Sequence, residues 1–353
     1  FLIRRPPLSI LFPYTTLFRS AELEDFKKHF DTCLSSSNLL LNSVIAHIRQ
    51  KNGKMMRPIL VLLAAKLYNE VRPATLHAAV ALELLHTASL VHDDVVDEST
   101  ERRGQLSVNA IFNNKVAVLT GDYLLATALV EAGMTRNYAI IDLVSNLGQD
   151  LAEGELLQLS NVSNPEYSEE VYFDVIRKKT AVLFAACMKA GALSVGVDDE
   201  KAEYARLFGE YIGLYFQIKD DIFDYYENKE IGKPTGNDML EGKLTLPALY
   251  VLNSTQDKPA QEIAVKVKNG TATADEIARL IEFTKEHGGI EYATKVMVDF
   301  KEKALSLLAA MEDTDVKRAL ISYLDYVIER RSEEHTSELQ SHHDLVCRLL
   351  LEK

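Results

Sequence analysis

Apolar residues recur at helical spacing along most of this chain. Between positions 21 and 50, for example, Leu23, Phe26 and Phe30 lie three or four residues apart, as they would on one face of an α-helix. No run of β-branched residues alternates with polar ones over a useful length, and Gly and Pro are few, at 16 and 9 residues. No linker rich in Pro, Gly or Ser lies between residues 104 and 208. The pattern therefore predicts an all-α protein with one large helical domain over residues 21–330.

The two ends of the chain do not follow this pattern. In residues 1–20, three prolines interrupt the apolar run, and the stretch LFPYTTLFRS looks like a translated sequencing adaptor. Residues 331–353, RSEEHTSELQSHHDLVCRLLLEK, look like the adaptor from the other end. We therefore expect both segments to be non-native and base the fold on residues 21–330.

The most informative predicted helix ends in an acidic cluster. Within residues 81–104, ALELLHTASLVHDDVVDESTERRG, an apolar segment without Gly or Pro precedes Asp93, Asp94 and Asp97. On a helix, Asp93 and Asp97 lie one turn apart on the same face, at the end where the helix dipole is also negative. Mg²⁺ would neutralise the negative charge of these crowded carboxylates, because it binds one or two carboxylates together with phosphate oxygens. Taken alone, the motif is also compatible with a solvated helix end.

A second copy of the motif favours the metal site over the solvated helix end. Residues 208–225, FGEYIGLYFQIKDDIFDY, form another apolar and aromatic helix that ends in Asp220, Asp221 and Asp224 with the same spacing. Two such DDxxD clusters can face each other across a helical bundle and hold several metal ions around one diphosphate. At these residues the sequence resembles the trans-isoprenyl diphosphate synthases, a family with two aspartate-rich motifs on facing helices.

The resemblance implies a fold and a reaction. The fold would be a single helical bundle of the isoprenoid synthase type around a central cavity. The enzyme would be a polyprenyl diphosphate synthase of the medium- to long-chain type, a prenyltransferase that condenses isopentenyl diphosphate head-to-tail with farnesyl or geranyl diphosphate. Its all-trans product would be a precursor of quinone side chains. The family further implies Mg²⁺, about three ions per active site, and a homodimer in the cytoplasm.

Basic residues supply the predicted substrate contacts. Lys54 and Arg57 stand just before Pro58, which suits a first helical turn, and two Gly-Lys pairs lie in the polar loop at 224–247. Each of these stretches is also compatible with a solvated loop, but both match the family. The resemblance assigns substrate binding to Lys54, Arg57, His86, Arg102, Arg103, Lys179, Thr180, Gln217, Lys233 and Lys243. It assigns metal binding and catalysis to the six aspartates, and a catalytic role to Lys179 as well.

Small residues before the first cluster predict the product length. Ala88 and Ser89 lie about one turn before Asp93, on the side along which the product would grow. Short-chain members of the family place an aromatic residue there as a floor. The small residues therefore predict a hexaprenyl to nonaprenyl diphosphate, with a short-chain farnesyl or geranylgeranyl synthase as the alternative.

The composition of the chain and its two intact acidic motifs argue against other classes of protein. The net charge of −13 argues against nucleic acid as a partner. The three cysteines form neither a metal spacing nor a disulfide framework, which fits a reducing cytoplasm. No apolar run approaches the roughly 20 residues of a membrane span. A terpene cyclase would have replaced the second motif, and a non-catalytic synthase subunit would have lost its acidic motifs, so both are remote alternatives.

Overall fold

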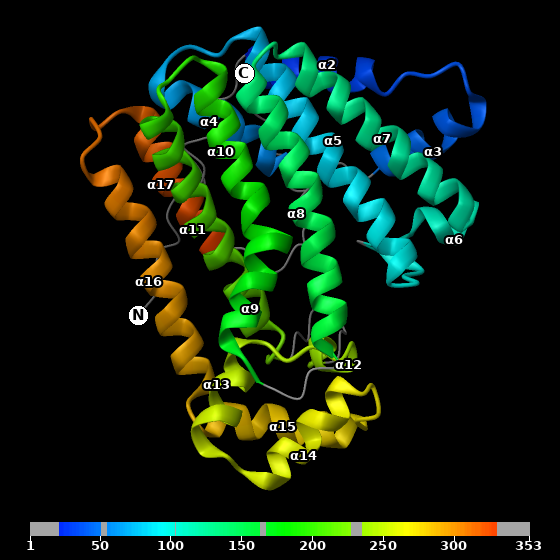
Figure 1. Cartoon of the computed structure of the whole chain (residues 1–353), viewed down its shortest axis with the longest axis vertical. Coiled ribbons are helices and arrows are strands. Elements are labelled where there is room, and N and C mark those ends of the chain that lie inside the picture. The colour runs from blue at the N-terminus through cyan, green and yellow to red at the C-terminus, as the bar shows by residue number, and fades with distance from the viewer. Residues whose placement is uncertain (1–20, 51–54, 103, 163–166, 227–234, 330–353) are drawn as a thin grey trace, which may run out of the picture. The chain divides into compact units, whose positions relative to one another are not determined.

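The computed structural model describes residues 21–50, 55–102, 104–162, 167–226 and 235–329. These residues form two compact units (Figure 1). The first unit contains residues up to 145, together with 186–205 and those from 312 onward. The second contains residues 146–185 and 206–311.

Helices make up nearly all of both units, as the sequence pattern predicts. The first unit contains α2 (Ala21–Cys33), α3 (Leu39–Arg49), α4 (Met56–Tyr68), α5 (Pro73–Val96), β1 (Glu101–Arg102), β2 (Gln105–Leu106), α6 (Val108–Phe112), α7 (Asn114–Met134) and α17 (Asp315–Glu329). The second contains α9 (Glu169–Ile176), the π-helix η2 (Arg177–Ala181), α12 (Asn237–Leu240), α13 (Leu246–Thr255), α14 (Lys258–Lys268), α15 (Ala274–Glu286) and α16 (Gly289–Ala309). Three helices carry residues of both units: α8 (Tyr138–Val162), α10 (Val182–Ser194) and α11 (Asp199–Phe223).

Helix α5 is the central helix of the first unit. Pro73 occupies its first turn, where a missing N–H costs no intrahelical bond, and Thr75 Oγ1 accepts a hydrogen bond from the Arg72 N–H at 3.1 Å. Its apolar residues are buried on more than one side, because α4 and α7 both pack against it. Figure 1 shows α5 and α7 running side by side. The helix ends at the first acidic cluster, and the short antiparallel pair β1–β2 follows.

Within the described residues, two helices, α5 and α7, are long and apolar enough to cross a membrane by length and composition. This finding does not contradict the expectation that no apolar run approaches a membrane span, because polar and charged residues such as Glu83 in α5 and Asp122 in α7 interrupt both helices. The buried share of the apolar window is 61% in α5 and 39% in α7. A core helix of a globular protein passes the same test, so this finding alone is weak evidence for a membrane span.

Two apolar clusters form the core of the second unit. One lies between α9, α11 and α13 and includes Tyr172, Ile218 and Leu249. The other joins α12 to α16 and includes Met239, Ile281 and Ile290. Gly213 allows α11 to approach η2 closely, since a Cβ at this position would lie 2.4 Å from the Ala181 Cα. These contacts position the end of α11, which carries the second acidic cluster.

Candidate active site

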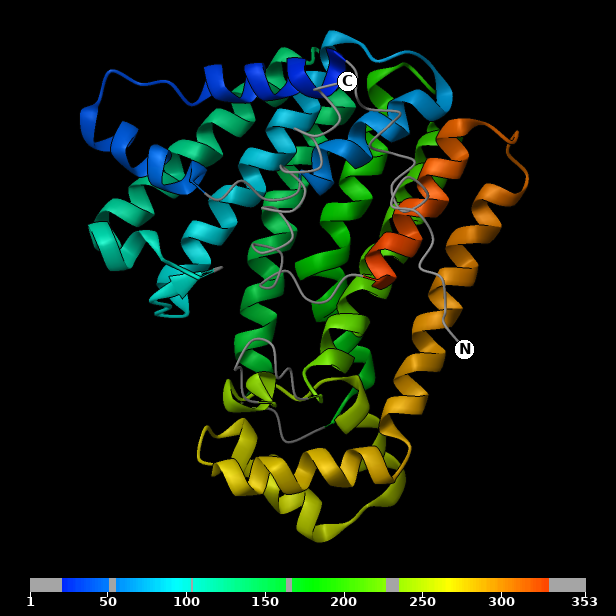
Figure 2. The same cartoon turned by 180° about the vertical axis from the view of Figure 1, so that it is seen from behind.

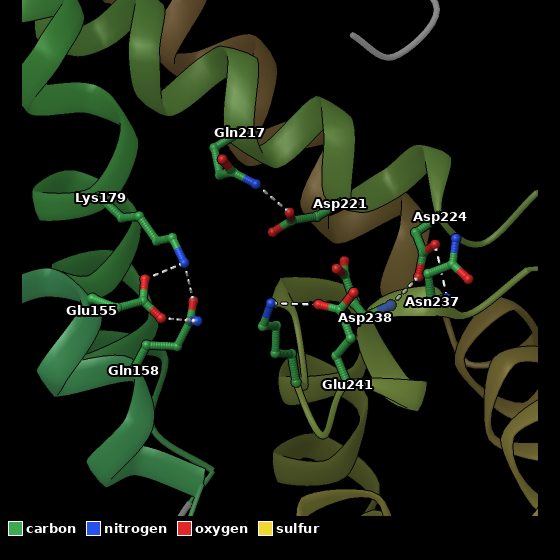
Figure 3. A network of polar contacts seen from close by, with 10 residues as sticks. Glu155, Gln158, Lys179, Gln217, Asp221, Asp224, Asn237, Asp238 and Glu241 are labelled. Carbon is green, nitrogen blue, oxygen red and sulfur yellow. Dashed lines mark hydrogen bonds and ion pairs between the residues drawn. The ribbon is translucent and has the colours of Figure 1, made fainter. Parts of the chain in front are cut away.

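Asp221 is the buried member of the second acidic cluster. The Tyr172 hydroxyl donates a 2.6 Å hydrogen bond to one carboxylate oxygen, and Gln217 Nε2 donates a 2.8 Å bond to the other. Figure 3 shows Gln217 pointing at Asp221 from one turn earlier on α11. Burial raises the pKa of Asp221 to about 7, although both hydrogen bonds act in the opposite direction. This carboxylate is therefore held in one orientation by two uncharged donors.

Asp224 has a different set of partners. Its two carboxylate oxygens accept the backbone N–H groups of Asn237 at 3.0 Å and Asp238 at 3.1 Å, which places the side chain at the start of α12 (Figure 3). Asp238 lies close enough to Asp221 for burial and the neighbouring carboxylates to raise its pKa well above the ordinary value. The second cluster thus includes a fourth acid that sequence reasoning missed.

Lys179 and Thr180 lie on the π-helix η2. The wider turn of a π-helix is rare and often marks a functional site. The Thr180 hydroxyl donates a 2.7 Å hydrogen bond to Gln217 Oε1, so it extends the chain of contacts to Asp221. Lys179 pairs with Glu155 and donates to Gln158 Oε1 at 3.4 Å (Figure 3).

Several of these residues line a pocket of about 200 Å³ within the second unit. Its polar lining includes a cationic part and an acidic part, made by Gln158, Tyr172, Lys179, Thr180, Gln217, Asp221, Asp238, Lys243 and Lys268. Five predicted site residues are therefore brought together, namely Lys179, Thr180, Gln217, Asp221 and Lys243. Asp220 is half-buried beside Asp221 on α11 and does not line this pocket.

The first acidic cluster lies in the first unit, at the end of α5. Asp94 is buried and accepts a 2.6 Å hydrogen bond from Arg102 Nε. Burial raises the pKa of Asp94, and the Arg102 charge acts against that shift. Asp93 is half-buried and Asp97 is exposed. The β1–β2 pair explains why Arg102 can reach back to the helix end, since it folds the chain directly after the cluster.

Arg57 and His86 also lie in the first unit. Arg57 Nε is buried and has no hydrogen-bond partner among the residues that the structure describes. Buried polar atoms are nearly always hydrogen-bonded, so this atom points to a missing acceptor. His86 lies half-buried on α5, two turns before the aspartates. Between them, Ala88 is buried and Ser89 is half-buried.

Three predicted site residues, Lys54, Arg103 and Lys233, lie outside the described residues. Sequence reasoning missed Tyr172, Asp238 and the pairing of Glu155 with Lys179. Tyr172 precedes Lys179 by two helical turns, and this spacing was a usable signal. The pairing of Glu155 with Lys179 joins two helices and had no local signal.

Comparisons with known proteins identify the family of this chain. The Polyprenyl synthetase family matches residues 38–284. Octaprenyl diphosphate synthase of Escherichia coli (strain K12) is 33% identical over 298 residues, which cover 84% of this chain and 92% of that protein. A solved polyprenyl synthase from Caulobacter crescentus CB15, complexed with calcium and isoprenyl diphosphate, is 32% identical, with a TM-score of 0.83 over 91% of this chain and 98% of that one. A geranylgeranyl pyrophosphate synthase structure from Bacteroides thetaiotaomicron is 64% identical, with a TM-score of 0.80 over 92% and 99%.

The all-α architecture and the two acidic helix ends define an enzyme of the isoprenoid synthase fold. The chain belongs to the polyprenyl synthetase family. It is accordingly a prenyltransferase, a prenyl diphosphate synthase like the enzymes it matches.

Proposed function

We propose that this prenyltransferase condenses isopentenyl diphosphate head-to-tail with farnesyl or geranyl diphosphate and releases an all-trans polyprenyl diphosphate. The observation that carries the proposal is the pocket of the second unit, where Lys179, Thr180, Gln217 and Lys243 surround the buried carboxylate of Asp221. Such a combination suits a diphosphate that brings its own divalent cations, because cationic donors bind its oxygens and the carboxylate binds the metal.

The acidic clusters fit Mg²⁺. All their donors are carboxylate oxygens, which hard cations prefer, and a bound cation would oppose the rise in the pKa of Asp221 that burial causes. We propose that the six aspartates of the two clusters hold the ions, at about three ions per active site, with Asp93, Asp97 and Asp220 as the principal ligands. When bound, the ions neutralise the negative charge that builds up on the departing diphosphate. The calcium in the Caulobacter crescentus enzyme supports a divalent ion of this class.

Lys179 and Thr180 would bind the allylic diphosphate, with Gln217 orienting the Thr180 hydroxyl. Lys179 now pairs with Glu155, and Arg102 with Asp94, so both cations must exchange a carboxylate for a phosphate oxygen when substrate binds. Isopentenyl diphosphate would be held by Lys54, Arg57, His86 and Arg103. The buried Arg57 Nε would then gain an acceptor.

The reaction breaks the allylic carbon–oxygen bond and forms a carbon–carbon bond to the isopentenyl group. We assign removal of the proton to the diphosphate that has just been released. Lys233 and Lys243 would cover the diphosphate as further cationic donors. Apolar helix walls would exclude water from the allylic cation.

The proposal predicts that turnover needs both acidic clusters. Asp93→Ala and Asp220→Ala should each lower kcat by about 100-fold or more, because each removes charge stabilisation made chiefly in the transition state. Steady-state kinetics with saturating Mg²⁺ measures this, and circular dichroism checks that helicity is kept. Asp142→Ala, an exposed aspartate on α8, is the matched control and should keep near-native turnover. Near-native turnover in either test variant would refute the assignment.

We propose a hexaprenyl to nonaprenyl product. Ala88 is only 1% exposed, and Leu85 and Leu82 on the preceding turns are also buried, so no aromatic floor lies on this part of α5. The Escherichia coli relative, an octaprenyl diphosphate synthase, supports this length. The 64% identity to a geranylgeranyl pyrophosphate synthase favours the short-chain alternative as the second candidate.

Mass spectrometry of the product decides between the two lengths. A long-chain wild-type product that Ala88→Phe shortens to farnesyl or geranylgeranyl length would support the first candidate. Since Phe overpacks a buried site at a cost of about 1–3 kcal/mol, Ser89→Phe on the half-buried neighbour is the second variant. A wild-type enzyme that already stops at geranylgeranyl diphosphate would establish the short-chain candidate.

A further inference from the structure

A further group of metal-ligating side chains lies in the first unit, away from both acidic clusters. It joins His29 and Cys33 on α2, His77 on α5 and Glu131 on α7. His29 Nε2 and His77 Nδ1 lie 2.8 Å and 2.7 Å from Glu131 Oε2, and Cys33 Sγ lies 3.0 Å from Glu131 Oε1. Figure 2 shows α2 lying across the end of α5 at which His77 is found.

The cluster is enclosed by protein. Glu131 is only 7% exposed, and His29, Cys33 and His77 are half-buried. A buried carboxylate is costly unless several partners satisfy it, and here donors from two other helices converge on it. His77 precedes Asp93 by 16 residues on the same helix, which is about 24 Å along its axis. The cluster therefore does not belong to the acidic end of α5.

We propose that His29, Cys33, His77 and Glu131 bind one divalent transition-metal ion of the Zn²⁺ class. Two imidazoles, one thiolate and one carboxylate form a complete tetrahedral set for zinc. Sulfur and imidazole ligands are softer than the oxygen ligands that Mg²⁺ and Ca²⁺ require, so this site selects against the ions of the acidic clusters. The thiolate and carboxylate charges would balance the ion, which leaves the enclosed site neutral.

Three of the four proposed ligands already lie close together, and Cys33 Sγ, which contacts the other carboxylate oxygen of Glu131, would have to move toward them. The ligand atoms of His29, His77 and Glu131 all lie within 4.8 Å of one another. In a tetrahedral zinc site, neighbouring ligand atoms are roughly 3.3–3.8 Å apart, given bonds of about 2.0–2.3 Å. The ion would replace the hydrogens that now lie between the rings, the thiol and the carboxylate. It would tie α2 to both α5 and α7.

Cobalt substitution tests the site with a signal that the acidic clusters do not give. The full chain, in excess Mg²⁺, is titrated with Co²⁺ and followed by its absorption spectrum. A Cys–Co²⁺ bond produces a sulfur-to-metal charge-transfer band, whereas Co²⁺ bound by carboxylates and water does not. We expect this band, together with the intense visible bands of tetrahedral cobalt, to saturate at about one ion per chain. Elemental analysis after dialysis should likewise find about one Zn²⁺ per chain.

Variants assign the ligands. Cys33→Ser should abolish the charge-transfer band, and His77→Ala should weaken Zn²⁺ binding by about 100-fold or more. Added Zn²⁺ should raise the melting temperature of the wild-type chain but not that of His77→Ala. Cys187→Ala controls for the other described cysteine. The double variant His342→Ala/His343→Ala controls for histidines outside the described residues, and both controls should keep the band.

Two results would overturn the proposal. One is a wild-type chain that shows no charge-transfer band at any Co²⁺ concentration, and the other is a band that persists in Cys33→Ser. If His77→Ala fails to fold, Glu131→Gln keeps the size and hydrogen-bonding capacity of the side chain. In that variant tight Zn²⁺ binding should be lost while helicity is retained, and unchanged binding would contradict the ligand set.

Discussion

Asp221 lies in surroundings that disfavour its charge, yet the proposed chemistry requires that charge. Tyr172 and Gln217 fix both of its oxygens, while Asp220, Asp224 and burial oppose ionisation. Its ordinary pKa of 3.8 is raised to about 7. Protonated Asp221 therefore stabilises the metal-free fold, fully below a pH of about 4 and less and less as the pH rises through about 7.

The pKa of Asp221 predicts a pH-dependent stability. Without divalent ions, the wild-type chain should lose on the order of 1–3 kcal/mol of unfolding free energy between about pH 5 and about pH 8, relative to Asp221→Asn, which cannot ionise. Urea unfolding at the two pH values measures the difference. Asp199→Asn, at the exposed start of α11, should follow the wild type. An identical pH dependence in wild type and Asp221→Asn would disprove the prediction.

At the level of residues, local spacing predicted the acids but not their environment. The repeated three-acid pattern identified Asp220, Asp221 and Asp224 as one cluster. It could not show that Asp224 accepts the N–H groups at the start of α12, because those residues lie 13 and 14 positions later. Asp238 joins the cluster through the same long-range turn. Contacts of this kind depend on the path of the loop, which the sequence pattern does not describe.

The π-helix η2 shows the same limit at the level of elements. The sequence of Lys178, Lys179 and Thr180 has no feature that demands a wider turn. Gly213 on α11 is the long-range partner, since its missing side chain leaves room for Ala181. The helical character of both segments followed from their apolar spacing. Their close approach depends on one glycine more than 30 residues away.

The approach of α11 to η2 predicts an effect of enlarging Gly213. A Cβ at this position would lie 2.4 Å from the Ala181 Cα, which is backbone and cannot rotate away. Gly213→Ala should therefore cost about 1–3 kcal/mol of unfolding free energy. It should also raise KM for the allylic diphosphate, because Thr180 and Lys179 move with η2.

Gly148→Ala is the matched control for this substitution. It makes the same chemical change within a helix, and a Cβ there meets nothing within 4 Å. The control should be neutral or stabilising by up to about 1 kcal/mol, as expected when alanine replaces glycine in a helix. Equal stability of the two variants in denaturant unfolding would show that the α11–η2 contact tolerates a side chain.

At the scale of the whole molecule, the sequence predicted the helical class and the family, and both are confirmed. These succeeded because helical periodicity and two spaced acidic motifs are local properties. Neither α5 nor α7 forms an uninterrupted apolar run, because polar and charged residues such as Glu83 in α5 and Asp122 in α7 interrupt them. The apolar window of α7 is less buried than that of α5, at 39% against 61%, so α7 has more apolar surface for contact with a partner.

Helix α7 presents an apolar side that the described part of the chain leaves open. Leu119 is 67% exposed and Val130 is 63% exposed, and both lie on the same side of the helix. Further exposed apolar residues on α7 are Val118, Leu129 and Met134. Large apolar surfaces of this kind usually mark an interaction site. We propose that a second copy of the chain covers it, in agreement with the homodimer that the family resemblance implies.

This proposal predicts a dimer that charges on α7 disrupt. Light scattering coupled to size-exclusion chromatography should give twice the chain mass for the wild type and the mass of one chain for Leu119→Asp/Val130→Asp, since two buried carboxylates in each copy would lack partners. Val265→Asp on α14, an exposed valine of the second unit, should leave the dimer intact. A wild-type chain that is monomeric at all concentrations but sediments with lipid vesicles would instead assign the apolar side of α7 to a membrane surface.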